Sequence, residues 1–284
     1  MSELARRIIF AVIAAPASVA VVYFGDWALA IVLSMLAATG AWELMRMARE
    51  TGAFPLEPAG IAIAALVPIA VHGQRLGIYT FSLTAVVTGC LVLLASSVWL
   101  RGPSGRPLSS VAITAFAILY AGLIAYAYPL RYHPYAVGAG AGTALVFLPI
   151  FLTWATDIGA YAFGRAFGKT KLMPTVSPGK TVAGAVGGLG LAVIICLLYV
   201  RLILMPFAQL GLTIQGAVLF GIIVSLAAQT GDLAESLLKR EAGVKDSSRI
   251  IPGHGGILDR FDSLLFVLPI AYLLLGRLLL PIPR

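Results

Sequence analysis

Charged side chains are scarce in this chain. They make up 11% of its 284 residues, whereas hydrophobic residues make up 60%. An average soluble domain carries roughly 25% charged residues. This composition excludes a disordered chain, which combines low hydrophobicity with high net charge. It also excludes an ordinary soluble globule, whose surface could not accommodate so much apolar side chain. The composition therefore predicts an all-α, polytopic integral membrane helical bundle.

Cysteine and histidine are rare as well, with two and three copies. Cys90 and Cys196 lie in separate apolar runs, which favours two buried small hydrophobic residues over a disulfide or a metal pair. His72 and His133 stand in isolated contexts and receive no role. The net charge of +8 would suggest nucleic acid in a soluble chain. In a membrane protein it is first explained by basic cytoplasmic loops, so we expect no nucleic acid partner.

Nine hydrophobic runs approach the length of about 20 residues that a spanning helix needs. The first follows Arg6 and Arg7 and resembles a signal peptide, but we interpret it as the first span because it stays hydrophobic through Phe24. The third is short and contains Pro68. The runs fall near 8–24, 27–47, 59–74, 77–100, 109–129, 138–163, 182–204, 213–234 and 263–280.

The distribution of basic residues predicts the orientation of these spans. With the N-terminus in the cytoplasm, fifteen of the 20 Lys and Arg residues fall in cytoplasmic segments. The positive-inside rule therefore favours about nine spans with a cytoplasmic N-terminus. Two cytoplasmic loops, 164–181 and 235–262, hold nine of the basic residues. The five residues on the other side are Arg75, Arg131, Arg201, Arg277 and Arg284.

Several of the 12 acidic residues lie within or at the end of apolar runs, namely Glu43, Asp157, Asp232 and Glu235. A charge at the centre of a spanning helix costs at least ~2.5–3.5 kcal/mol on insertion scales. Two interpretations stay open: a role in helix packing or interhelical salt bridges, and a polar cavity at the membrane boundary. For Glu43, nothing nearby in the sequence decides between them.

The spacing of polar residues supports the cavity. Asp157, Tyr161 and Arg165 are four apart and share one helix face. Asp232 and Glu235 are three apart, as are Asp259 and Asp262. Two such carboxylate pairs on the cytoplasmic side can form an oxygen-rich site for a hard cation such as Mg²⁺. The alternative is a set of solvated acid–base pairs.

The two basic loops favour an anion site, although a plain topogenic loop remains the alternative. In 164–181, Ser177, Lys180 and Thr181 directly precede a long apolar helix, where backbone N–H groups, hydroxyls and a lysine suit phosphate oxygens. The spacing does not match a Walker A loop. In the following apolar run, close helix packing explains the glycines better than a dinucleotide loop. They are Gly184, Gly187, Gly188 and Gly190.

The second loop contains Pro252-Gly253-His254-Gly255-Gly256. Glycines let a backbone approach a ligand closely. His254 could serve as a metal ligand, an acid or base, or a phosphate donor, or it could be an ordinary hydrogen-bonded histidine.

Residues 236–262 read S-L-L-K-R-E-A-G-V-K-D-S-S-R-I-I-P-G-H-G-G-I-L-D-R-F-D, which resembles the signature of the phosphatidate cytidylyltransferases, also called CDP-diacylglycerol synthases. A second stretch from Asp157 to Thr181 is similar to the same family. Together the two stretches cover roughly the C-terminal half, and the N-terminal half resembles the family only in hydropathy. The resemblance divides the chain into N-terminal transmembrane helices, 1–135, and a catalytic transmembrane region, 136–284.

The resemblance implies a reaction of CTP with phosphatidate that yields CDP-diacylglycerol and pyrophosphate, with Mg²⁺ as cofactor and a second metal ion left open. It implies metal ligands at Asp232, Asp259 and Asp262. The implied catalytic residues are Asp232, Lys239, Asp246, His254, Asp259 and Arg260. The implied substrate-binding residues are Asp157, Arg165, Lys169, Ser177, Lys180, Thr181, Ser236, Arg240, Lys245, Gly255 and Gly256.

The partners so implied are CTP, phosphatidate and membrane lipid, and a homodimer stays open. The implied location is the cell inner (cytoplasmic) membrane, with the active site on the cytoplasmic side. Two other functions compete. A CTP-dependent kinase of lipid alcohols such as polyprenols or phytol would release CDP rather than pyrophosphate. A secondary transporter would place its polar residues near the bilayer middle and contain internal repeats.

Overall fold

The structure is a computed structural model that describes residues 3–78, 80, 82–251 and 255–282, with side chains from residue 12 onward. In this part of the chain, every predicted hydrophobic run overlaps a helix, although the helix in the run 77–100 begins only at Leu83. The helices are α1 (Glu3–Phe24), α2 (Asp26–Glu50), α3 (Glu57–Arg75), α4 (Leu83–Leu100), α5 (Pro107–Gly122), α6 (Ala127–Arg131), α7 (Gly138–Phe167), α8 (Val182–Tyr199), α9 (Ile214–Glu241) and α10 (Leu258–Leu278).

Shorter elements connect these helices. A turn of 3₁₀ helix (Pro103–Gly105) precedes α5, another (Leu123–Tyr126) joins α5 to α6, and a π-helical segment (Val200–Ala208) continues α8. Two antiparallel strand pairs complete the described fold: β1 (Lys171–Met173) with β2 (Ser177–Thr181), and β3 (Leu210–Gly211) with β4 (Leu280–Pro281). The predicted helical fold class is confirmed, and the two short strand pairs were not predicted.

Seven helical segments of the described chain are long and apolar enough to cross a membrane. They are Asp26–Glu50, Leu83–Leu100, Pro107–Arg131, Gly138–Phe167, Val182–Ala208, Ile214–Glu241 and Leu258–Leu278. The described apolar part of α1, Val12–Phe24, is shorter than this, and α3 does not meet the same requirement of length and hydropathy. The chain is therefore a multi-pass helical membrane protein, and a count of about nine spans stays a prediction.

The chain divides into two compact units. Unit 1 comprises residues 1–21, 25–128 and 238–261, and unit 2 comprises 22–24, 129–237 and 262–284. The stretch that holds most of the signature, 238–261, therefore folds with the N-terminal helices. The sequence-based division at residue 135 concerned function and stays a prediction.

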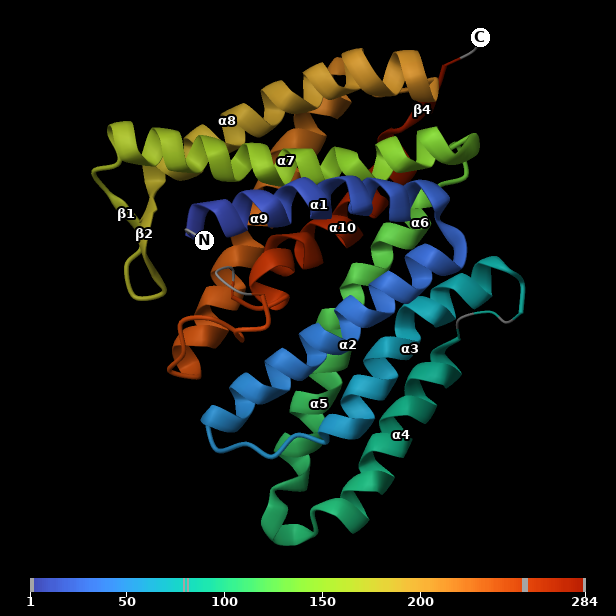
Figure 1. Ribbon diagram of the computed structural model, residues 1–284, viewed down its shortest axis with the longest axis vertical. Coiled ribbons are helices and arrows are strands. Elements are labelled where there is room, and N and C mark those ends of the chain that lie inside the picture. Colours follow the sequence, from blue (N-terminus) through green and yellow to red (C-terminus); the bar gives the residue numbers. More distant parts are fainter. Residues whose placement is uncertain (1–2, 79, 81, 252–254, 283–284) are drawn as a thin grey trace. The chain divides into compact units, whose positions relative to one another are not determined.

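In unit 1, helices α2, α3 and α5 pack against one another, and α4 packs against α5 (Figure 1). The packing is close where small residues face larger ones: a Cβ at Gly60 of α3 would lie 2.8 Å from the sulfur of Met45. The end of α4 is tied to the α2–α3 loop because Arg101 donates to the carbonyl oxygens of Phe54, at 3.0 Å, and Pro55, at 2.6 Å.

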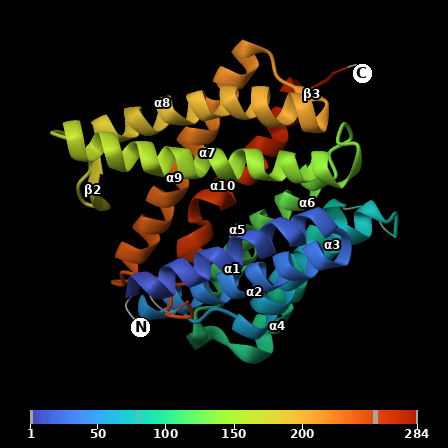
Figure 2. The same cartoon turned by 45° about the horizontal axis from the view of Figure 1, so that its top comes forward.

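In unit 2, α7 and α8 run antiparallel side by side, joined by the β1–β2 hairpin (Figures 1 and 2). Glycines allow this approach. A Cβ at Gly159 would lie 2.7 Å from the carbonyl oxygen of Gly187, and one at Gly188 would lie 2.6 Å from that of Thr156. The prediction of small-residue helix packing is confirmed for Gly184, Gly187 and Gly188, each of which faces α7 closely, whereas a Cβ at Gly190 would meet nothing within 4 Å.

The two predicted loops are shorter than expected. Helix α7 extends to Phe167, so Gly164 and Arg165 are helical, and the remainder of 164–181 forms the hairpin. Thr181 ends the hairpin and begins α8, because its hydroxyl accepts a hydrogen bond from the backbone N–H of Gly184 at 3.1 Å. In the second loop, α9 continues to Glu241 and α10 begins at Leu258, so the two helices are joined by residues 242–257.

Candidate functional site

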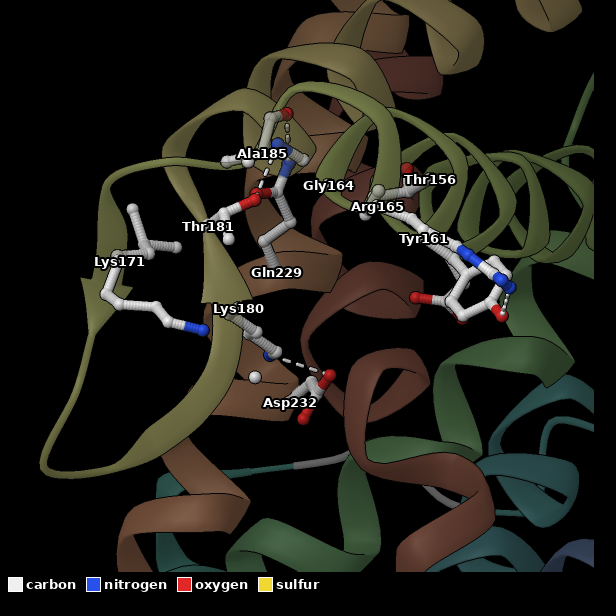
Figure 3. A pocket seen from close by; sticks show the side chains of 16 residues that line it. Thr156, Tyr161, Gly164, Arg165, Lys171, Lys180, Thr181, Ala185, Gln229 and Asp232 are labelled. Carbon is white, nitrogen blue, oxygen red and sulfur yellow. Dashed lines mark hydrogen bonds and ion pairs between the residues drawn. The ribbon is translucent and has the colours of Figure 1, made fainter.

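A cavity of about 570 Å³ lies in unit 2, lined by α7, the β1–β2 hairpin, the start of α8 and the middle of α9 (Figure 3). Five of the predicted site residues line it: Asp157, Arg165, Lys180, Thr181 and Asp232. Tyr161 lines the same cavity, so the predicted face of Asp157, Tyr161 and Arg165 is confirmed. Lys171, Gln229 and Thr156 also line it, and sequence reasoning gave them no role.

Three cationic side chains border the cavity. Lys180 of β2 forms an ion pair with Asp232 of α9, with 2.7 Å between Nζ and Oδ2. Lys171 of β1 also lines the cavity, so the hairpin contributes two lysines (Figure 3). Arg165 donates to the hydroxyl of Tyr161 at 3.1 Å, one helical turn away. Such an arrangement suits an anion with several oxygen atoms.

A polar network holds α7, α8 and α9 around the cavity. The hydroxyls of Thr156 and Ser225 lie 3.0 Å apart and share a hydrogen bond. Gln229 donates to the Ser225 hydroxyl and to the carbonyl oxygen of Ala185, each at 3.2 Å. The sequence signal for this network was the polar spacing of Ser225, Gln229 and Asp232 along one face of an apolar run.

Carboxylates lie beside Lys180 in unit 2. Asp157 interacts electrostatically with Asp232, Asp262 and Lys180. Asp232 also accepts a hydrogen bond from the Ser236 hydroxyl at 3.3 Å. In the described part of the chain, no three His, Cys, Asp or Glu side chains are grouped as a metal cage. Mg²⁺ is commonly held by one or two carboxylates together with substrate phosphates, a donor set that Asp232 and Asp262 can supply.

The signature residues of unit 1 form a separate hydrogen-bonded cluster around Asp259. Lys239 pairs with Asp259, with 2.7 Å between Nζ and Oδ1. The other carboxylate oxygen, Oδ2, accepts hydrogen bonds from the backbone N–H of Ser247 at 2.9 Å, the Ser247 hydroxyl at 2.8 Å and the backbone N–H of Gly256 at 2.8 Å. Lys239 and Asp259, which were both predicted as catalytic, thus form an ion pair. The metal role of Asp259 stays a prediction.

The paired glycines of the signature are explained by this cluster. Gly255 has φ +81°, a conformation that side-chain-bearing residues rarely adopt, and a Cβ there would lie 2.8 Å from Asp259 Oδ2. A Cβ at Gly256 would overlap the Ser247 hydroxyl oxygen. Packing within this cluster therefore explains why both residues are glycine, whereas their contact with substrate stays a prediction.

The remaining predicted site residues occupy less enclosed positions. Four of them are exposed in unit 1, namely Arg240, Lys245, Asp246 and Arg260. In unit 2, Lys169 is exposed and Ser177 is half-buried. Ser236 contacts Asp232, and Thr181 both lines the cavity and caps α8. The prediction for His254 lies outside the described residues.

Fold and pocket together define a class: a multi-pass helical membrane protein with a cavity bordered by lysines, an arginine and carboxylates. The model of the Cytidylyltransferase family matches residues 5–278, so the chain belongs to that family.

Curated relatives carry a more specific name. The chain is 51% identical over 134 residues to a phosphatidate cytidylyltransferase of Staphylococcus saprophyticus, a match that covers 47% of this chain and 50% of the relative. Proteins of the same name from Staphylococcus haemolyticus and Staphylococcus aureus are 50% and 47% identical over the same shares. The chain spans about half the length of the curated relatives it matches.

Proposed function

We propose that this chain is a phosphatidate cytidylyltransferase that converts CTP and phosphatidate to CDP-diacylglycerol and pyrophosphate. Family membership and the name of the relatives support the reaction. The observation that carries it in the structure is the cavity of unit 2, where Lys171, Lys180 and Arg165 stand beside Asp157 and Asp232. Both substrates are phosphate esters, and both require cationic groups at a membrane surface.

The cations of the cavity bind phosphate oxygens. Lys180 is held by Asp232 at 2.7 Å, so it is positioned before a ligand arrives. An entering phosphate competes with Asp232 for the ammonium group, and Lys171 and Arg165 supply further donors around the same space. Because the charges lie in a partly enclosed cavity, water screens them less than it would on an open surface.

In the proposed reaction, an oxygen of the phosphatidate phosphate attacks the α-phosphorus of CTP. A new phosphorus–oxygen bond forms there, while the bond between the α-phosphorus and the bridging oxygen to the β-phosphate breaks, and pyrophosphate leaves with that electron pair. A phosphate monoester is largely ionised near pH 7, so a strong general base is not required. Positioning and charge neutralisation then account for most of the catalysis.

Mg²⁺ fits the carboxylates of unit 2, and we propose Asp232 and Asp262 as its ligands. When bound, the ion neutralises charge on the nucleotide phosphates and favours departure of pyrophosphate. The chain's own contribution is to hold Asp232 in place through Lys180 and Ser236, which contact its two carboxylate oxygens. In unit 1, Lys239 keeps its predicted role in phosphate binding, and Asp259 keeps its predicted roles in catalysis and as a metal ligand.

The proposed orientation follows from the basic residues. Placing the N-terminus in the cytoplasm puts the β1–β2 hairpin and the 242–257 loop on the side where CTP is found. We propose about nine spans, with α1 and α3 added to the seven segments that meet the length and hydropathy requirement. The protein would then lie in the bacterial cytoplasmic membrane, where its lipid substrate is reached from within the bilayer.

The test is an assay of the purified, detergent-solubilised protein with CTP, phosphatidate and Mg²⁺, following pyrophosphate and CDP separately. We expect pyrophosphate and CDP-diacylglycerol in equal amounts. Lys180→Met should lose most of the activity, whereas Arg201→Met, which removes an exposed cation outside the cavity, should retain it. Release of CDP with a polyprenol or phytol acceptor, or inactivity beside an active control enzyme, would overturn the proposal.

A further inference from the structure

Glu43 of α2 is fully buried, and its carboxylate accepts four hydrogen bonds from the signature region of unit 1. The hydroxyls of Ser247 and Ser248 donate at 3.1 and 2.5 Å. The backbone N–H groups of Ile257 and Leu258 donate at 2.9 and 2.6 Å. A buried carboxylate in a spanning helix is costly, so four converging donors are the compensation that its position requires.

Two of these donors belong to the start of α10. The first N–H groups of a helix have no partner within the helix, and they carry its partial positive charge. A side chain of the preceding few residues usually caps them. Here the cap comes from a residue 214 and 215 positions earlier in the chain. Glu43 therefore fixes where α10 begins relative to α2, which a local cap could not do.

The other donors connect Glu43 to the Asp259 cluster. The Ser247 hydroxyl lies 3.1 Å from Glu43 Oε2 and 2.8 Å from Asp259 Oδ2, so its single proton is shared between two carboxylates. Asp259 in turn pairs with Lys239 at 2.7 Å. The path from Glu43 to Lys239 thus consists of direct contacts through Ser247 and Asp259. Gly256 is packed into the same cluster, since a Cβ there would lie 2.5 Å from Glu43 Oε1.

We propose that Glu43 is a positioning residue for the proposed cytidylyl transfer: it holds Ser247, Ser248 and the start of α10 in the arrangement in which Asp259 pairs with Lys239. The expected effect of Glu43 on kinetics rests on the proposed function. Its expected effect on amide exchange does not. Glu43 contacts Ser247, Ser248 and the start of α10, and it acts on the reaction through them.

The first experiment measures amide hydrogen exchange in the substrate-free protein, comparing wild type with Glu43→Gln and Glu50→Gln. Gln keeps the shape of Glu43 but places an NH₂ group against N–H donors. We expect exchange at Ile257 and Leu258 to quicken at least about tenfold, because their amides donate to the carboxylate oxygens of Glu43 and one of these oxygens is replaced, while peptides of α8 stay unchanged. Glu50 is an exposed carboxylate on the same helix, so its variant should behave as wild type. Unchanged exchange at Ile257 and Leu258 in Glu43→Gln would overturn the proposal.

The second experiment measures kinetics per folded protein, with the folded fraction taken from size-exclusion profiles. A displacement of about 1 Å in aligned groups can lower the rate about 100-fold, so we expect kcat/KM to fall by that order, with a raised KM for CTP. A purely structural role would reduce activity per milligram and leave KM unchanged, and that result would overturn positioning. If wild type itself is inactive with CTP and phosphatidate while exchange at Ile257 and Leu258 responds as expected, the proposed function fails and the contact of Glu43 with the start of α10 stands.

A milder variant guards against misfolding of Glu43→Gln. Ser248→Ala removes one donor to Glu43 and does not touch the amides of Ile257 and Leu258 directly. If Glu43 couples Ser248 to the start of α10, exchange at Ile257 and Leu258 should quicken in Ser248→Ala. Unchanged exchange there would overturn the coupling.

Discussion

Gly256→Ala tests the packing of the signature segment most directly. The new Cβ would overlap the Ser247 hydroxyl oxygen and lie 2.5 Å from Glu43 Oε1, so these groups must move by about 1 Å to reach ordinary contact. Overpacking of this kind costs about 1–3 kcal/mol. The movement also strains the hydrogen bond from Gly256 N–H to Asp259, and hydrogen bonds to charged groups are worth about 1.5–3 kcal/mol. We expect a destabilisation of about 3 kcal/mol.

The assay is thermal unfolding of the detergent-solubilised protein, followed by the pyrophosphate assay at a temperature where the variant stays folded. We expect a lower unfolding midpoint and activity reduced about 100-fold. Ser247→Ala combined with Gly256→Ala removes the nearest clashing atom, so the double variant should be less destabilised than the two single effects added together. Gly190→Ala is the matched control, because a Cβ there meets nothing within 4 Å. A Gly256→Ala protein as stable as the control would refute the reasoning.

Three further outcomes are expected. Asp259→Asn should abolish turnover while folded protein remains in the membrane, and near wild-type activity at saturating Mg²⁺ would contradict its metal role. Asp232→Asn should weaken the interaction with Lys180, which lies 2.7 Å away, and raise the KM for CTP or the Mg²⁺ concentration required. Identical curves of activity against CTP and against Mg²⁺ for variant and wild type would count against a role of the ion pair in substrate or metal binding. Gly188→Ala should lower the unfolding midpoint by an amount equivalent to about 1–3 kcal/mol, because its Cβ would lie 2.6 Å from an α7 carbonyl oxygen, whereas Gly190→Ala should leave the midpoint unchanged.

The sequence by itself determined the helices and one face of the cavity. Long apolar runs separated by charged or proline-containing segments can only become helices in a membrane, because each backbone group must find its partner within its own segment. A period of 3.6 residues per turn places Asp157, Tyr161 and Arg165 on one side of α7, and all three line the cavity. The signature of residues 236–262 was likewise enough to indicate the family that the whole-chain match shows.

Only the tertiary structure decided which polar groups meet. The pairs Lys180–Asp232 and Lys239–Asp259 join residues 52 and 20 positions apart, and no local rule of spacing selects them. Glu43 had no explanation in its own neighbourhood, since its partners lie more than 200 residues further along the chain. The physical reason is that helix periodicity is a local property, whereas a buried charge is satisfied by whichever donors the packing of distant segments brings within about 3 Å.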